Sequence, residues 1–384
     1  MFARLSNRVS GFNVQHTVAS VRTSPAAQAA SAKLAFYKTR TMATINKNKK
    51  KLMGIAVVIF FITVYFVIFF RRGPRFLSRM NKNYTACKIT SLRYNTKVMS
   101  NTANYKLKDF YIAASYKSYL PCTNYMDYAS IDSIQRILFF GCRHIDIDIM
   151  NSGFGCTNLV VCAGRERGNW HYTTSIPLEK TLEFISLYAF GKEVPNGEDP
   201  LFLSLNFNTW YNKDAFDDCA ALIKKFFIRK LLPIEYGYKG RQSKVNICDI
   251  PIKNVLDKLV IICNDDVEDT DMDELVNMGS SDYGNIRTVT HKEILDCKDI
   301  KEFREFNKTY MTKVVPSFEG RMKQNYNYLL PYYLGCQFIC MNYTEPEQWM
   351  RLYVNTFSEY SFVLKPYKLR HKIDNIKRPF SNTY

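Results

Sequence analysis

Acidic residues are missing from the first 108 positions of this 384-residue chain, because no Asp or Glu precedes Asp109. Those positions hold twenty Lys and Arg, whereas the remaining 276 residues hold 33 basic and 35 acidic residues. The formal net charge of +18 at pH 7 therefore belongs to a basic leader, and the body is nearly neutral. This distribution argues against nucleic acid as the partner of the body.

Glycine and proline are also scarce, with 16 and 13 residues, which excludes a collagen-like or low-complexity chain. The eleven cysteines include no CxxC pair and no Cys/His run with zinc-ligand spacing. Several cysteines lie inside apolar, strand-like runs, so we expect buried free thiols. With 47% hydrophobic residues, the chain can form one large domain or two ordinary ones.

Residues 52–70 form a strongly apolar run of nineteen residues without a charge. As a helix they would span about 28 Å, close to the ~30 Å hydrocarbon core of a bilayer. Lysines at 47–51 and arginines at 71–79 flank the run. We predict a single transmembrane helix here, followed by a basic juxtamembrane linker at 71–106. Because both flanks are basic, the orientation stays open.

The leader, residues 1–46, is rich in Ser, Ala and Arg and amphipathic in its first turns. Residues 1–41 resemble a mitochondrial transit peptide in composition. Two alternatives stay open, a disordered basic tail and a translation start at Met42. The sequence thus predicts a single-pass membrane protein without deciding which membrane it occupies.

After residue 108 the sequence alternates between short β-rich runs and stretches with the 3.6-residue apolar spacing of helices. This order, repeated over about 260 residues, favours a parallel α/β fold, either a (β/α)₈ barrel or a doubly wound sheet. The predicted strands are 110–115, 144–149, 159–162, 201–207, 259–263, 337–343 and 361–364, and the predicted helices are 130–140, 178–190 and 214–232.

A run of seven acids in ten residues, 265–274, interrupts this pattern. Such a run is typical of an exposed linker, because closely spaced carboxylates resist packing. We therefore divide the body into a first half at 107–264, an acidic linker at 265–287, a second half at 288–370 and a tail at 371–384.

Five blocks of the body resemble the X and Y regions of eukaryotic phosphoinositide-specific phospholipase C, in the same order. The resemblance implies a distorted TIM barrel of the phospholipase-C-like phosphodiesterase type, with an X-like half before the acidic linker and a Y-like half after it. The blocks are LKDFYIAASYKSYL (107–120), GCRHIDID (141–148), PLFLSL (200–205), GCQFICMNY (335–343) and FVLKP (362–366).

The family's reaction, as the resemblance implies it, needs two histidines and a calcium ion held by Asn, Glu, Asp and Glu. The first His-Asn pair falls on Tyr116 and Lys117, where a phenol replaces the base and an ammonium replaces a ligand. The strand carboxylates fall on Asp146 and Asp148, which would be the calcium ligands if calcium were retained. The last Glu ligand falls on Asn206, which is neutral.

The second histidine of the family falls on Trp170, with His171 one position further along. His171 and His144 are the candidate catalytic residues, and strand alternation places His144 on the face of Asp146 and Asp148. His144 also fits an ordinary core histidine.

The resemblance places the lysines that grip ring phosphates near Cys263 and Asp265. The family's Arg-x-Tyr-Pro falls on 313–316, so Lys313 keeps a cation at the site. Lys117 could stand where calcium would sit and offset the charge of Asp146 and Asp148. It could equally be a structural counter-ion for two carboxylates left from an ancestral site.

Two functions follow from these substitutions. The first is a membrane-anchored, catalytically degenerate barrel that binds a phosphoinositide or other anionic lipid, or a protein partner, without a metal cofactor. The second is an active phospholipase C or phosphodiesterase, a phosphoric diester hydrolase, that works without metal through Lys117 in the calcium position.

Overall fold

The computed structural model describes residues 25–83, 89–100, 105–121, 129–152, 158–165, 170–171, 173–209, 212–237, 245–280, 285–317, 325–344 and 346–370. The chain divides into two compact units, Met1–Arg72 and Gly73–Tyr384. Helix α2 (Pro25–Lys47) and most of α3 (Lys49–Asn83) lie in the first unit. Within α3, Lys49–Ile68 has a mean hydropathy of 2.5 and is long and apolar enough to cross a membrane.

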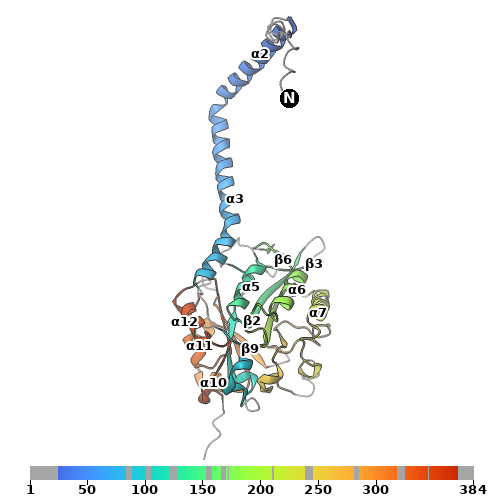
Figure 1. Cartoon of the computed structure of the whole chain (residues 1–384), viewed down its shortest axis with the longest axis vertical. Coiled ribbons are helices and arrows are strands. Elements are labelled where there is room, and N and C mark those ends of the chain that lie inside the picture. Colours follow the sequence, from blue (N-terminus) through green and yellow to red (C-terminus); the bar gives the residue numbers. More distant parts are fainter. Residues whose placement is uncertain are drawn as a thin grey trace, which may run out of the picture. The chain divides into compact units, whose positions relative to one another are not determined.

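The second unit is built on a curled sheet of parallel strands (Figure 1). Along the sheet the parallel strands follow the order β8, β7, β2, β1, β11, β10 and β9. Beyond β8, a single parallel bridge joins Ile262 to Met278, so the chain between β8 and β9 contributes only this bridge to the sheet. The bounds are β1 (Phe110–Ser115), β2 (His144–Ser152), β7 (Leu201–Asn208), β8 (Leu259–Cys263), β9 (Ile286–Thr290), β10 (Met311–Val315) and β11 (Phe338–Met341).

This order is that of a distorted (β/α)₈ barrel, as the resemblance implied. Side chains alternate along each strand between two buried layers. Along β1, Phe110 and Ile112 belong to an interior cluster, whereas Tyr111 and Ala113 pack in the layer shared with the helices. Toward the carboxyl ends of the strands the interior becomes polar, which is where barrel enzymes place their sites.

The predicted helices of the first half are confirmed. Helix α5 (Ile131–Phe139) begins after Ser130, whose side chain accepts a hydrogen bond from the backbone N–H of Asp132. Gly141 follows it with φ of +83°, a conformation that favours glycine. Helices α6 (Leu178–Tyr188) and α7 (Lys213–Phe227) match their predicted ranges within a few residues.

Strands β12 (Phe362–Leu364) and β3 (Asn158–Val161) were expected, but β12 runs antiparallel to β1 and β3 runs antiparallel to β2. The shorter antiparallel strands and the helices of the second half were not predicted. Strands β3 (Asn158–Val161) and β6 (Ile176–Pro177) extend the sheet beside β2 in antiparallel fashion, and β4 (Gly164–Arg165) pairs with β5 (Trp170–His171). The further helices are α4 (Thr96–Met99), α9 (His291–Leu295), α10 (Ile300–Phe306), α11 (Leu329–Tyr333) and α12 (Gln348–Thr356).

The prediction of an exposed linker at the acidic run is wrong. Val267 and Met272 are buried, and Cys263 donates its backbone N–H to the carbonyl of Met278 at 3.0 Å. Lys224 of α7 pairs with the carboxylates of Asp271 and Glu274 at 3.3 and 3.4 Å. The run packs because apolar residues alternate with the acids, most of which face solvent beside basic residues of α7.

The expectation of free thiols is confirmed for the cysteines in the described part of the chain. All eight are free, and seven of them are buried. Desolvation raises the pKa of the buried thiols, for example that of Cys142 to about 11, so these cysteines act as small apolar side chains.

Candidate functional site

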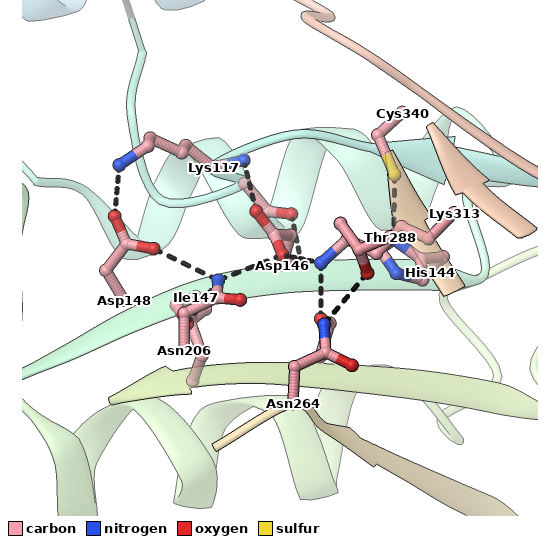
Figure 2. A network of polar contacts seen from close by, with 12 residues as sticks. Lys117, His144, Asp146, Ile147, Asp148, Asn206, Asn264, Thr288, Lys313 and Cys340 are labelled. Carbon is pink, nitrogen blue, oxygen red and sulfur yellow. Dashed lines mark hydrogen bonds and ion pairs between the residues drawn. The ribbon is translucent and has the colours of Figure 1, made fainter. Parts of the chain in front are cut away.

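Four elements bring the predicted site residues together at the carboxyl ends of the strands (Figure 2). Asp146 and Asp148 project from β2 on the same face, two residues apart. Asn206 projects from the paired position of β7, because Asp148 and Asn206 are partners in the sheet register. Lys313 comes from β10, and Lys117 from the loop that follows β1. The sequence thus predicted a real cluster.

Asp146 is held by three donors. Its Oδ1 accepts from Nζ of Lys313 at 2.7 Å and from Nδ2 of Asn206 at 3.1 Å, and its Oδ2 accepts from the backbone N–H of Lys117 at 3.1 Å. The side chains of Asp146 and Lys313 are only 1% and 2% exposed. Lys313 also donates to the hydroxyl of Ser204 at 2.6 Å. Asp146 and Lys313 therefore form a buried ion pair.

Asp148 is held by a separate set of groups. Its Oδ2 contacts Nζ of Lys117 and accepts from the hydroxyl of Tyr119 at 2.8 Å. Its Oδ1 accepts from Nδ2 of Asn206 at 3.0 Å. Asn206 thus bridges the two carboxylates through its amide donor. Each carboxylate has its own lysine, since Lys117 pairs with Asp148 and not with Asp146, contrary to the expected position between them.

Lys117 adopts φ of +44°, which is uncommon for a residue with a side chain. This backbone lets its N–H reach Asp146 while its ammonium turns to Asp148. A left-handed conformation of this kind costs about 1 kcal/mol or more and persists where surrounding contacts determine it.

Electrostatics keep the cluster ionised. Burial opposes the charge of Asp146, but the ammonium of Lys313 and the other groups that stabilise the carboxylate together outweigh it, so the pKa of Asp146 falls below its usual range. For Lys313 burial also acts against the charge, and the carboxylate of Asp146 raises its pKa overall. Lys117 behaves likewise, because Asp148 together with Tyr116 and Asp146 outweighs its burial and raises its pKa. At pH 7 Asp146 is therefore an anion, and Lys117 and Lys313 are cations.

His144 lies on β2 two residues before Asp146, and its side chain faces the barrel interior. It is fully buried, its Nδ1 lies 3.3 Å from the carbonyl of Ser115, and its ring lies 5.1 Å from that of Phe338. Burial, together with the nearby Lys313, lowers the pKa of His144 to about 3. His144 is therefore a neutral core histidine, and its Nε2 has no hydrogen-bond partner within the described part of the chain.

The remaining two candidates are His171 and Tyr116. His171 belongs to β5, where its backbone pairs with Gly164, and its side chain lies outside the described residues. Tyr116 is half-buried at the end of β1 and packs beside the interior cluster. Burial raises the pKa of its phenol above the ordinary value.

Cys263 and Asp265, near which the resemblance places the phosphate-gripping lysines, are engaged outside the barrel interior. Cys263 packs in the outer layer with the helices, and Asp265 accepts from the backbone N–H of Phe207 at 2.9 Å. Strand alternation directs Ile262 and Asn264 inward instead. Asn264 donates to the hydroxyl of Thr288 on β9 at 2.8 Å, so this side of the mouth is neutral.

Two residues of the site were missed from the sequence. Ser204 lies two residues before Asn206 on β7, and this spacing could have placed it on the same face. Tyr119 lies in the irregular chain after β1, where no periodicity applies.

Comparison with known proteins accounts for this arrangement. The X domain of phosphatidylinositol-specific phospholipase C matches residues 103–249. A human protein named "Inactive phospholipase C-like protein 1" is 23% identical over 322 residues, which are 70% of this chain and 28% of the human protein. Crystal structures of PLC21 from S. officinalis and L. pealei are similar with a TM-score of 0.58 at 16% identity, over 70% of this chain and 38% of theirs.

The chain spans well under half the length of these relatives. The likeness to the two PLC21 structures supports the barrel fold, and the match to the X domain covers the strands that carry Lys117, Asp146, Asp148 and Asn206. Residues 103–249 therefore carry a divergent X domain, and the barrel resembles that of phospholipase C in its fold.

Proposed function

We propose that this protein is a membrane-anchored, non-hydrolytic member of its family that binds a lipid headgroup. The observation that carries the proposal is the internal neutralisation of the site. Lys313 pairs with Asp146, and Lys117 pairs with Asp148, so neither carboxylate is left for a metal ion or a proton transfer.

The residues present do not fit the calcium ion that the family resemblance implies. Calcium takes six to eight oxygen ligands. Here Asn206 must direct its amide nitrogen to both carboxylates, because each of those oxygens is an acceptor. The ammonium of Lys117 on Asp148 would repel a divalent cation, so we expect the wild-type protein to work without calcium.

The position of the first histidine lacks a good general base as well. Tyr116 stands where the resemblance places it, and burial raises the pKa of this phenol further from neutrality. Loss of a general base costs about 10²–10⁴ in rate. The name of the human relative, an inactive phospholipase-C-like protein, agrees with this reasoning.

The charges at the mouth favour a headgroup with a single phosphate. Lys117 is 18% exposed, whereas Lys313 is 2% exposed and committed to Asp146. Asn264 and Thr288 on the neighbouring strand ends are neutral. Among the described residues of this cluster, Lys117 carries the accessible ammonium, and one ammonium suits one phosphodiester.

Membrane anchoring through α3 would hold the barrel near its ligand. The span Lys49–Ile68 supports this part of the proposal by its length and hydropathy. The basic residues on both sides of the span would favour an anionic leaflet, at about 1 kcal/mol for each residue near the surface. Under this proposal residues 52–70 are the anchor, and 71–106 lead from it into the X-like half. They are more than the expected linker, because residues 89–99 pack into the barrel.

The test uses the full chain in nanodiscs that contain phosphatidylinositol or its bisphosphate, with calcium or with chelator. We expect the protein to retain phosphatidylinositol, to retain the bisphosphate more weakly and to release no inositol phosphate. Calcium-dependent release would refute the proposal. Release that persists with chelator and is lost in His171→Ala would instead establish the metal-independent phosphodiesterase. The control variant is Lys225→Met, which removes an exposed lysine outside the site.

A further inference from the structure

Residues 89–99, here called the floor strap, close the barrel at the end opposite the site. The strap contains a 3₁₀ turn (Leu92–Tyr94) and α4. Leu92 and Val98 are buried in the interior cluster together with Phe110 and Phe202, which lie at the amino ends of β1 and β7. The strap follows α3 in the sequence and is part of the barrel's packing.

A single buried carboxylate, that of Asp199, fastens the strap. Its Oδ1 accepts from the hydroxyl of Ser91 at 2.8 Å and from the backbone N–H of Leu92 at 2.7 Å. Asp199 is fully buried. Its Oδ2 is also buried and has no hydrogen-bond partner among the described residues. One oxygen therefore makes both contacts, and the other is desolvated without compensation.

The charges around Asp199 do not neutralise it fully. Arg143 is fully buried beside it, but its guanidinium donates to carbonyls of Ala189, Asp199 and Pro200 rather than to the carboxylate. The adjacent Glu198 is an acid that pairs at the surface with Arg93 of the strap, at 3.3 Å. Asp257 also acts on Arg143.

We propose that Asp199 is a proton-linked latch that fastens the floor strap to the barrel more tightly when it is protonated. Protonation removes a buried charge and leaves Oδ1 able to accept from Ser91 and Leu92. This inference uses contacts at the barrel floor and is independent of the proposed lipid binding.

The direction of the effect follows from linkage. Burial, only partly offset by Arg143, raises the pKa of Asp199 from 3.8 to about 6 in the closed strap. An open strap would expose the carboxyl to water and return its pKa to the ordinary value. The closed state therefore binds the proton more tightly, and closing strengthens as the pH falls below about 6. Between about pH 7.5 and pH 5 the closing equilibrium should increase about tenfold.

Hydrogen–deuterium exchange of the full chain in nanodiscs tests the latch. After correction for the intrinsic exchange rate, protection of the strap amides should be about tenfold greater at about pH 5 than at about pH 7.5. In Asp199→Asn the ratio should fall to about one. The matched control, Glu179→Gln, neutralises an exposed acid that pairs with Lys225 and not with the strap, and it should keep the tenfold ratio.

Equal strap protection at both pH values in the wild type, or a tenfold ratio that persists in Asp199→Asn, would overturn the proposal. If Asp199→Asn does not fold, Ser91→Ala provides the second measurement. It removes one hydrogen bond to Oδ1, so strap protection should drop at both pH values while the ratio between them remains. Loss of that ratio in Ser91→Ala would also contradict the latch.

Discussion

Replacing Lys313 by Met removes the cation of the buried pair and leaves Asp146 charged in the barrel interior. Asp146 would keep the donors from Asn206 and the backbone of Lys117, both at 3.1 Å, but lose the 2.7 Å contact to the ammonium. Both partners are almost fully buried, so solvent screening is weak. Breaking such a pair costs about 3–5 kcal/mol in the free energy of unfolding at pH 7.

The pH dependence of this loss has a definite sign. In the wild type the pKa of Asp146 is depressed, so its ionised form stabilises the fold above the unfolded pKa of 3.8 and the contribution is lost as pH falls through the folded pKa. In Lys313→Met burial dominates and raises the pKa of this carboxyl. Protonation at mildly acidic pH then removes the uncompensated charge, so the deficit should shrink as the pH falls from 7 toward 4.

Urea unfolding of the full chain in detergent, followed by fluorescence, measures the loss. The double variant Asp146→Asn/Lys313→Met should recover most of it, because neither position of the buried pair then carries a charge. The exposed pair of Lys225 with Glu179 is the control, and Lys225→Met should leave the unfolding midpoint unchanged. The reasoning is refuted if Lys313→Met is no less stable than this control, or if the double variant is as unstable as the single one.

Further predictions concern the interior histidine, the tyrosine on Asp148 and the membrane span. His144 has a folded pKa of about 3 against 6.5 unfolded, so its contribution to stability falls as the pH drops below 6.5, by about 2 kcal/mol at pH 5. His144→Gln should abolish that loss of stability between unfolding curves measured above pH 6.5 and at pH 5. An unchanged pH dependence in the variant would argue against this role of His144. Tyr119→Phe deletes one hydrogen bond to a charged carboxylate and should cost about 1.5–3 kcal/mol in urea unfolding, whereas no change would mean that water replaces the hydroxyl. Ile59→Arg, near the middle of the predicted span, should reduce membrane insertion measured by alkaline extraction, and full retention would contradict a spanning helix.

The sequence alone placed most of the first half of the barrel. Strands such as 110–115 and 259–263 carry continuous apolar residues, and their predicted bounds agree with β1 and β8. Helix α5 was predicted from its capping serine and closing glycine. The second half was harder, because β10 and α11 are five residues long and carry Lys313 and Pro331 within them.

The acidic run shows why charge counts mislead. Carboxylates every second residue predicted solvation, yet Val267 and Met272 between them supply the buried contacts. The partner lysine, Lys224, lies about fifty residues away in sequence on α7, so no local pattern could reveal the pairing.

The candidate site was predicted in its members but not in its pairing. Strand alternation placed Asp146 and Asp148 on one face, and their register with Asn206 follows from neighbouring parallel strands. The division of the two lysines between the two carboxylates depends on the left-handed backbone of Lys117 and on a contact from β10 to β2. Neither can be read from local sequence.

A calcium titration tests most directly whether Lys117 and Lys313 already neutralise the two carboxylates of the site. Calorimetry of the full chain in detergent should show no binding heat for the wild type up to about 1 mM calcium, because Lys117 and Lys313 already neutralise the carboxylates. The variant Lys117→Asn/Asn206→Glu removes the ammonium, restores two oxygen ligands and should gain calcium binding. Wild-type binding at micromolar calcium that disappears in Asp148→Asn would contradict the account.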